Sequence, residues 1–529
     1  MHIKPNRLWI TVLLLGWLFD FLFWKHAPGI SFAIYVTATL IAGFILLRLA
    51  GVRPARWTLV LVLPILFFAG MTFIRLEPLS TSLAYLGTFF LLAALAVTFQ
   101  GGRWISYGVA DYFAKAIDLF ASSVARPLTF AVETRQTEQA TTEGEKKRPA
   151  FVWAIVRGLL LAVPVLAFFV ALLSSADPIF AGRVQGLVEL FRLENLPEYI
   201  FRVIYISILA YGLAGVFLHA AVRSQDEKLL GEEKPLLAPF FGFTEAAVVL
   251  GSVILLFGSF VAIQFQYFFG GQANIHIEGY TYAEYLHKGF GELVTVAFFT
   301  LLLFLGLSAV VRRETAFRQK AFSALGVLLF ALVAMILVSA YQRLILYESA
   351  YGFTRLRTYI HVFMIWVALL LAVVVLLDLL GRQRAFALAA VLASLGFAAT
   401  LMLMNVDGFI VRQNVQRAAQ GRDLDVGYLA SLSPDAVPML VSLYQSPALD
   451  APIHERLGAV LACMQAESTP AAPQDNSWQS FHLSNYWAES SLASIRLDLK
   501  AYTPDDSVWP HKVKTPLGKE YECTSYADD

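Results

Sequence analysis

The sequence predicts an all-α fold: a polytopic helical membrane protein of about eleven transmembrane helices with a small helical extracytoplasmic domain at its C-terminus. Three observations predict this class. Hydrophobic residues make up 58% of the 529 residues and charged residues 15%, against about 45–50% and about 25% in soluble domains. The apolar residues gather in runs long enough to span lipid, and such runs stop near residue 405. The connections between the runs alternate between rich and poor in lysine and arginine.

Each span requires about 20 mostly apolar residues, and it must be helical because lipid offers no partner to backbone N–H and C=O groups. The runs that meet this length are 8–24, 28–47, 57–74, 79–99, 158–176, 203–222, 243–269, 289–311, 321–342, 358–380 and 386–405. The first run ends in Phe23-Trp24-Lys25-His26 without a small-residue cleavage site. We therefore interpret it as an uncleaved span and not as a secretion signal.

Basic charge in the connections predicts the orientation, since lysine and arginine favour the cytoplasmic side. With the N-terminus inside, the inside segments hold 22 of these residues and the outside connections before the C-terminal domain hold nine. A missed or an invented span would scramble this alternation. We therefore expect a cytoplasmic N-terminus and an extracytoplasmic C-terminus.

A polar stretch divides the spans into two groups, a four-span unit at 1–99 and a seven-span domain at 158–405. The stretch between them, 100–157, is expected in the cytoplasm. Apolar residues recur there at helical spacing from Trp104 to Val124, which predicts an amphipathic helix. It either lies along the membrane face or packs under the bundle. Residues 133–150 have no apolar period and are typical of a disordered linker.

Residues 406–529 form a tail, a name kept below. Its predicted short helices lie near 407–420, 424–431, 434–445, 452–465 and 485–500, and the stretch after Pro504 is expected to be extended or irregular. The chain has two cysteines, Cys463 and Cys523, and both lie in the tail. An oxidising compartment permits a disulfide between them, and two unpaired thiols are the alternative.

The densest group of polar residues is predicted at the outer ends of the seventh to tenth spans. Its members are Gln264, Tyr282, Glu284, Tyr285, Glu292, Arg343, Glu348, Arg355, Arg357 and His361. A charge at membrane depth costs about 2.5–3.5 kcal/mol on insertion scales, so such groups are usually paired. The carboxylates available to the three arginines are Glu284, Glu292 and Glu348. The group is either a network that locks the helices together or an outward-facing pocket for an anionic or amphipathic ligand, with Glu292 or His361 handling protons.

The usual motifs of soluble catalysis are missing from the sequence: it has no phosphate-binding loop, H-E-x-x-H, C-x-x-C, G-x-S-x-G or dinucleotide fingerprint. We expect no cofactor and no metal. A net charge of +1 without a clustered basic face argues against nucleic acid as a partner. The expected partners are the lipid bilayer and either an extracytoplasmic protein or an amphipathic ligand.

Several phrases carry a resemblance to a known family. They are FVAIQFQYFFGG at 260–271, YAEY at 282–285, GFGEL at 289–293, YGFTRLR at 351–357, DVGYLASL at 425–432 and WQSFHLS at 478–484. In these phrases the chain resembles bacterial integral membrane proteins catalogued as domain of unknown function 4173, with relatives under 4153. The first four spans match only in being hydrophobic. The resemblance implies this architecture and a bacterial inner-membrane address, and it implies no mechanism.

These observations favour a non-enzymatic envelope protein that acts in sensing, scaffolding or assembly through its tail and outer polar group. A transporter or flippase for an amphipathic solute is an alternative, although the sequence has no internal repeat of the kind common in transporters. A membrane-embedded transferase acting on a lipid-linked substrate at Glu292, Arg355 and Arg357 is a third hypothesis.

Overall fold

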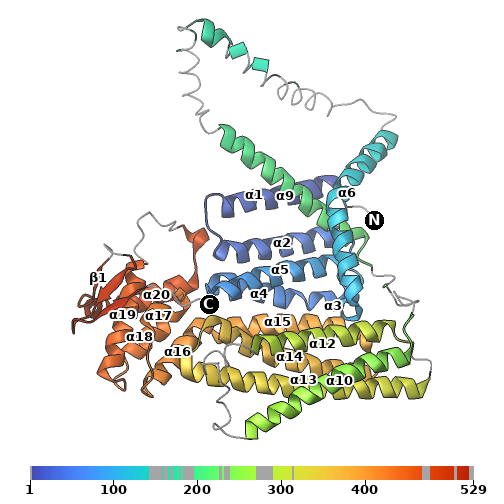
Figure 1. Cartoon of the computed structure of the whole chain (residues 1–529). Coiled ribbons are helices and arrows are strands. Elements are labelled where there is room, and N and C mark those ends of the chain that lie inside the picture. The colour runs from blue at the N-terminus through green and yellow to red at the C-terminus, as the bar shows by residue number, and fades with distance from the viewer. Residues whose placement is uncertain are drawn as a thin grey trace. The chain divides into compact units, whose positions relative to one another are not determined.

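The structure is a computed structural model that describes residues 3–141, 196–225, 229–230, 239–269, 290–312, 315–467, 477–505 and 509–523, with scattered residues from 158 to 182. The chain divides into two compact units (Figure 1). Unit 1 consists of Met1–Trp24, Ala38–Arg53 and Ile117–Ser224, and unit 2 consists of Lys25–Thr37, Pro54–Ala116 and Gln225–Asp529. Each unit is described by itself.

Unit 1 contains helices whose polar side chains are paired. Its helices are α1 (Pro5–Phe23), α9 (Leu196–Val222), most of α2 (Ile30–Leu49) and most of α6 (Val109–Thr141). On α1, the buried Asp20 accepts hydrogen bonds from Arg202 and Tyr205 of α9. Pairing of this kind offsets the cost of a charge at membrane depth. A Cβ at Gly215 would overlap the backbone of Ser123, so glycine lets α9 lie close to α6.

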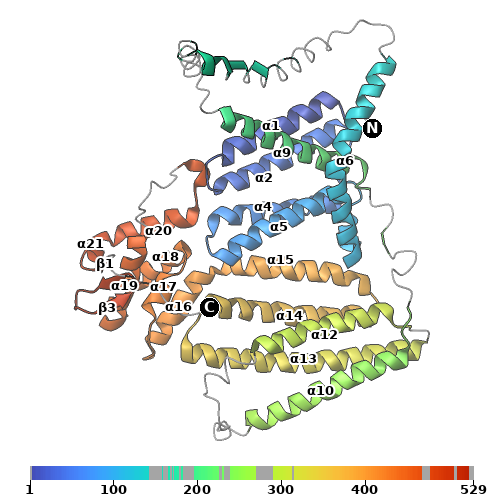
Figure 2. The ribbon, with the colours of Figure 1, turned by 45° about the horizontal axis from the view of Figure 1, so that its top comes forward.

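Unit 2 contains a bundle of long apolar helices that run side by side in both views (Figure 2). Its membrane elements are α3 (Arg56–Leu59), α4 (Val62–Ile74), α5 (Pro78–Val97), α10 (Phe243–Phe269), α12 (Phe290–Val310), α13 (Ala316–Tyr351), α14 (Arg355–Leu379) and α15 (Phe386–Met404), with 3-10 turns η1 (Arg103–Ser106) and η4 (Gln383–Ala385). The buried ring of Phe304 packs against Phe322 and Phe330. Gly326 lies under Phe304, which leaves no room there for a Cβ.

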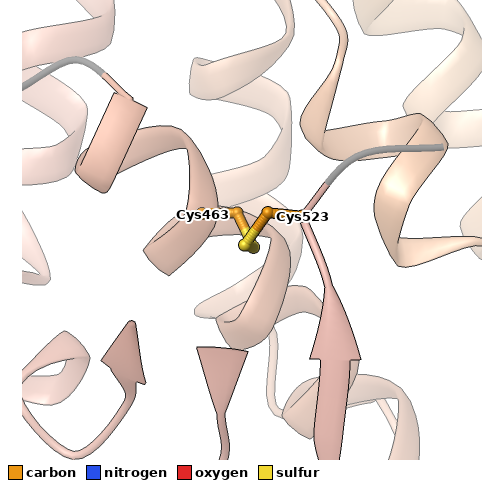
Figure 3. The surroundings of a disulfide bond; sticks show 2 residues. All are labelled: Cys463 and Cys523. Atoms are coloured by element: carbon orange, nitrogen blue, oxygen red, sulfur yellow. A yellow bond between two sulfur atoms is a disulfide. The ribbon is translucent and has the colours of Figure 1, made fainter. Parts of the chain in front are cut away.

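The tail is a compact domain at one end of this bundle. Its elements are α16 (Val406–Ala418), α17 (Val426–Ala430), η5 (Pro434–Ala436), α18 (Val437–Tyr444), α19 (Ala451–Glu467), η6 (Trp478–Ser480), α20 (Leu483–Ser494), α21 (Arg496–Leu499), β1 (Thr503–Asp505), β2 (Lys512–Lys514) and β3 (Glu520–Glu522). The strands form an antiparallel sheet in the order β1-β2-β3. A disulfide joins Cys463 at the end of α19 to Cys523 just after β3 (Figure 3).

The predicted fold class is confirmed. Ten helices among the described residues are long and apolar enough to cross a membrane, and they match ten of the predicted runs. The remaining run, 158–176, is described only in part. The small sheet adds strands that we did not predict, in the stretch expected to be extended or irregular.

The helix predicted from Trp104 to Val124 begins later and ends later, because α6 covers Val109–Thr141. It therefore includes residues 133–141, where we predicted a disordered linker. Glutamate, glutamine, arginine and alanine there are good helix formers, and extending an existing helix avoids the cost of nucleation. Its apolar stripe, which includes Phe113, Ile117 and Phe120, is exposed, as expected of a helix in contact with lipid.

Candidate functional site

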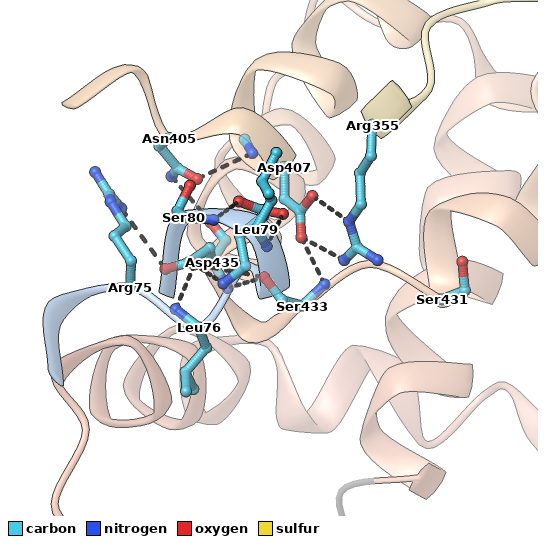
Figure 4. A network of polar contacts seen from close by, with 12 residues as sticks. Arg75, Leu76, Leu79, Ser80, Arg355, Asn405, Asp407, Ser431, Ser433 and Asp435 are labelled. Carbon is cyan, nitrogen blue, oxygen red and sulfur yellow. Dashed lines mark hydrogen bonds and ion pairs between the residues drawn. The ribbon is translucent and has the colours of Figure 1, made fainter. Parts of the chain in front are cut away.

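The buried polar network of unit 2 lies where the tail meets the membrane helices (Figure 4). Arg355 begins α14, and its Nε and Nη2 donate to the two carboxylate oxygens of Asp407 at 2.8 and 2.7 Å. Asp407 has no exposed surface and also accepts the backbone N–H of Ser433 at 2.7 Å. This forked arrangement is the strongest geometry for an arginine–carboxylate pair.

The local sequence places Asp407 at this position. After α15 ends, Asn405 adopts a left-handed conformation with φ of 54°, which asparagine tolerates better than most residues. Its side-chain oxygen caps α16 by accepting the N–H of Gly408 at 3.2 Å. The chain therefore turns at once into α16, and Asp407 in the first turn of α16 faces the start of α14.

A second carboxylate of the tail binds the loop between α4 and α5. Oδ2 of Asp435 accepts the backbone N–H groups of Leu76 and Glu77 at 2.8 and 2.9 Å. Its other oxygen lies 3.6 Å from Nη1 of Arg75. Arg75 in turn donates through Nε to the carbonyl of Met402 at 2.8 Å. Charge and backbone groups thus hold the tail to the ends of two spans.

Glu77 completes this network from the membrane side. Its carboxylate caps α5 by accepting the N–H groups of Leu79 and Ser80 at 2.9 and 2.8 Å, and it also accepts the hydroxyl of Tyr359 on α14. Because Glu77 is almost fully buried, these partners are what stabilise its charge. We call the set Arg75, Glu77, Arg355, Tyr359, Asp407, Ser433 and Asp435 the tail junction.

A further set of contacts joins α16 to the turn after α13. The amide of Asn414 both accepts from the N–H of Phe353 and donates to its carbonyl, each at 2.9 Å. Arg417 donates to the carbonyl of Ala350 at 3.0 Å. Burial lowers the pKa of Arg417 from its usual range, with Arg422 and Arg357 nearby adding to this effect.

The loop between α1 and α2 holds the tail at another point. Ser480 donates to the carbonyl of Ala27 at 2.9 Å, and the N–H of Ile30 donates to the carbonyl of Phe481 at 3.0 Å. Nε2 of His482 lies 3.1 Å from the carbonyl of Pro28.

Replacing His482 by glutamine is expected to flatten the pH dependence of stability. Burial lowers the pKa of His482 below its ordinary value of 6.5, against the opposing effects of Pro28 and Asp435. The folded state then binds fewer protons than the unfolded state, so its stabilising contribution is complete above about pH 6.5 and falls as the pH drops below it. Thermal midpoints measured from pH 7.5 to 5 should fall more steeply for the native chain than for His482→Gln. Equal slopes would contradict this assignment.

The structure brings Glu348 and His361 of the predicted polar group together, and it shows other partners for Gln264 and Arg357. Oε1 of Gln264 accepts the hydroxyl of Ser339 at 2.9 Å. Arg357 lies 4.3 Å from the ring centroid of Tyr347. Arg343 is half-buried on α13 and Glu292 is exposed in the first turn of α12.

Tyr282, Glu284 and Tyr285 lie outside the described residues. Glu348 was one of the three carboxylates expected to be available to the arginines. Its Oε2 lies 2.6 Å from Nε2 of His361, while Arg355 binds Asp407, because α16 turns back over the start of α14.

Sequence reasoning missed the tail carboxylates and Glu77. The structure shows that Ser433 begins the helix predicted at 434–445, since its hydroxyl accepts the N–H of Asp435 at 3.3 Å. One feature of the sequence could have indicated the tail carboxylates: Asp407 lies only two residues after a predicted span, where a charge is expected at the membrane surface.

Beside the tail junction lies a cavity of about 390 Å³, lined by Arg75, Asn405, Asp435 and residues of α20. The hydroxyl of Ser484 on its wall is buried and has no hydrogen-bond partner within the part of the chain that the structure describes.

Comparisons with known proteins identify one family. The model of a family described as domain of unknown function (DUF4153) matches residues 62–443. The match begins within the third predicted span, so it includes spans that the resemblance described only as hydrophobic, and it covers all seven residues of the tail junction. No curated protein and no solved structure matches the chain.

Proposed function

Since the chain belongs to the DUF4153 family, whose description names no activity, we propose that it is a non-enzymatic envelope scaffold of the bacterial inner membrane. In this proposal the spans hold the tail in one fixed position at the extracytoplasmic surface, where the tail serves sensing or assembly. The observation that carries the proposal is the tail junction. A domain on a flexible tether needs no buried contacts with its anchor, whereas here two tail carboxylates bind the start of α14 and the loop between α4 and α5.

The orientation is supported by two independent features. Lysine and arginine are concentrated in the connections placed inside, 22 against nine. The disulfide between Cys463 and Cys523 is typical of an oxidising compartment outside the cytoplasm.

Labelling of introduced cysteines tests the orientation. Lys500 is exposed on the tail, and Arg382 is exposed in the turn between α14 and α15. Lys500→Cys should react with a small membrane-impermeant maleimide in intact cells, and Arg382→Cys should react only after the membrane is opened. The reverse pattern would place the tail in the cytoplasm.

The function itself is tested by expressing variants of the tail junction in cells that lack the native gene. Arg355→Ala removes the partner of Asp407, and Arg357→Ala is a matched control, because it removes the same charge from the same helical turn and its guanidinium donates to Gly352 instead of to a tail carboxylate. If a fixed tail is what matters, Arg355→Ala should lose complementation of envelope defects while Arg357→Ala keeps it, at equal protein level. Full complementation by Arg355→Ala at normal level would contradict the proposal.

A transport function is the second candidate, favoured by the pair of Glu348 and His361 within two adjacent spans. Paired ionisable groups inside the membrane are common in proton pathways. Proton movement into liposomes that carry the purified protein, abolished by His361→Ala, would favour transport over a scaffold.

A further inference from the structure

The cavity beside the tail junction lies at the depth where spans end. Arg75 directly follows α4, Asn405 directly follows α15, and the opposite wall is formed by α20 of the tail. A ligand in this cavity would therefore sit at the surface of the bilayer, under a cover made by the tail. Its volume of about 390 Å³ falls within the range of ligand pockets, about 300–1,000 Å³.

Two buried oxygen atoms on the cavity wall lack hydrogen bonds. Among the described residues, the hydroxyl of Ser484, a residue only 1% exposed, has no partner, and Oδ1 of Asp435 accepts no hydrogen bond, although Arg75 lies 3.6 Å away. Buried polar atoms are almost always satisfied in folded proteins. A ligand that both donates and accepts hydrogen bonds would satisfy these two atoms. It would bond to the hydroxyl of Ser484 and donate to the carboxylate oxygen of Asp435.

The charge of the wall selects the class of ligand. Arg75 and Asp435, 3.6 Å apart, balance each other. A phosphate would face the carboxylate of Asp435, and a cation would face the guanidinium of Arg75. A neutral polyol meets neither repulsion, since its hydroxyls donate to Asp435 and accept from Arg75. Trp487 on the rim offers an exposed ring for the apolar face of a sugar.

We propose that this cavity binds the sugar headgroup of a glycolipid, with Ser484, Asp435 and Arg75 bonding its hydroxyls and Trp487 packing against its ring. The position at the membrane surface favours a lipid over a free sugar, because the acyl chains of a headgroup held at this depth remain in the bilayer. The inference goes beyond the scaffold function and depends on the contacts around the cavity rather than on which side the tail faces.

The test uses the full-length protein in nanodiscs and native mass spectrometry. The probes are monoglucosyl-diacylglycerol, phosphatidylethanolamine as a lipid without a sugar, and free glucose. The glucolipid should bind, with an affinity at least tenfold higher than that of either other probe. Ser484→Ala removes one hydroxyl without enlarging the side chain and should weaken glucolipid binding about tenfold, and Trp487→Leu should do the same.

Trp478→Leu is the matched control, because this tryptophan is also exposed on the tail but does not line the cavity, and it should leave binding unchanged. Equal binding of phosphatidylethanolamine, or unchanged affinity in both cavity variants, would overturn the site. Glucose that binds as tightly as the glucolipid would overturn the assignment to a lipid. None of these variants removes Arg355 or Asp407, so they leave the ion pair of the tail junction in place. A negative binding result would therefore count against the glycolipid site and not against the scaffold proposal.

Discussion

Asp407→Ala is expected to lower the free energy of unfolding by about 3–5 kcal/mol, the usual cost of removing one partner from a buried ion pair. The change leaves the guanidinium of Arg355 without its carboxylate, and it leaves the N–H of Ser433 without an acceptor. The measurement is a guanidinium titration of the purified protein in detergent. Asp407→Asn should lose somewhat less, because its amide oxygen still accepts from Ser433.

The double variant Arg355→Met/Asp407→Leu separates the charge effect from general damage. Replacing a buried pair with apolar residues of similar size is often neutral or stabilising, since no charge remains to be desolvated. Most of the lost stability should therefore return in the double variant. A loss below about 1 kcal/mol for Asp407→Ala would show that the pair contributes as little as an exposed one.

Removing the disulfide is expected to cost about 4 kcal/mol in the tail. The bridge joins residues 60 positions apart, and closing a loop of that length removes this much conformational entropy from the unfolded chain. Cys463→Ser/Cys523→Ser should open the segment between the two positions, which includes α20 and the sheet, while α10 to α14 stay protected. Hydrogen exchange followed by mass spectrometry reports both regions.

Each single cysteine variant should match the double, because either one removes the bond. Reduction of the native protein should reproduce the same exchange pattern. An unchanged exchange rate in α20 and the strands after reduction would contradict a stabilising role for the bridge. Since α20 forms one wall of the cavity, the same treatment should also weaken glucolipid binding.

The membrane helices were predictable from the sequence because lipid imposes one rule on every span. The run at 243–269 coincides with α10. Helix α13 exceeds its predicted run of 321–342 at both ends. Hydropathy reports the apolar stretch alone, whereas this helix continues beyond it to Tyr351 and ends at Gly352, whose φ is 89°.

The tail junction was not predictable, because its partners are far apart in sequence. Asp435 binds Leu76 across 359 positions and Asp407 binds Arg355 across 52. The cost of an unpaired charge near the membrane indicated that Arg355 requires a carboxylate, but the sequence offers several. The turn at Asn405 decides which of them reaches Arg355. The strands escaped prediction for another reason, since each has three residues, too few for an alternating pattern to be recognised.

The distance between one label on the spans and one on the tail tests most directly whether the tail is fixed. Ser82 on α5 and Arg422 on the tail are both exposed in unit 2, and the native cysteines are joined to each other, so spin labels can be attached at Ser82→Cys and Arg422→Cys. Pulsed electron resonance in nanodiscs should give one narrow distance distribution for the otherwise native chain, and a broad one when Arg355→Ala is added. A broad distribution in both proteins would mean that the tail moves freely, which contradicts a junction that holds it in place.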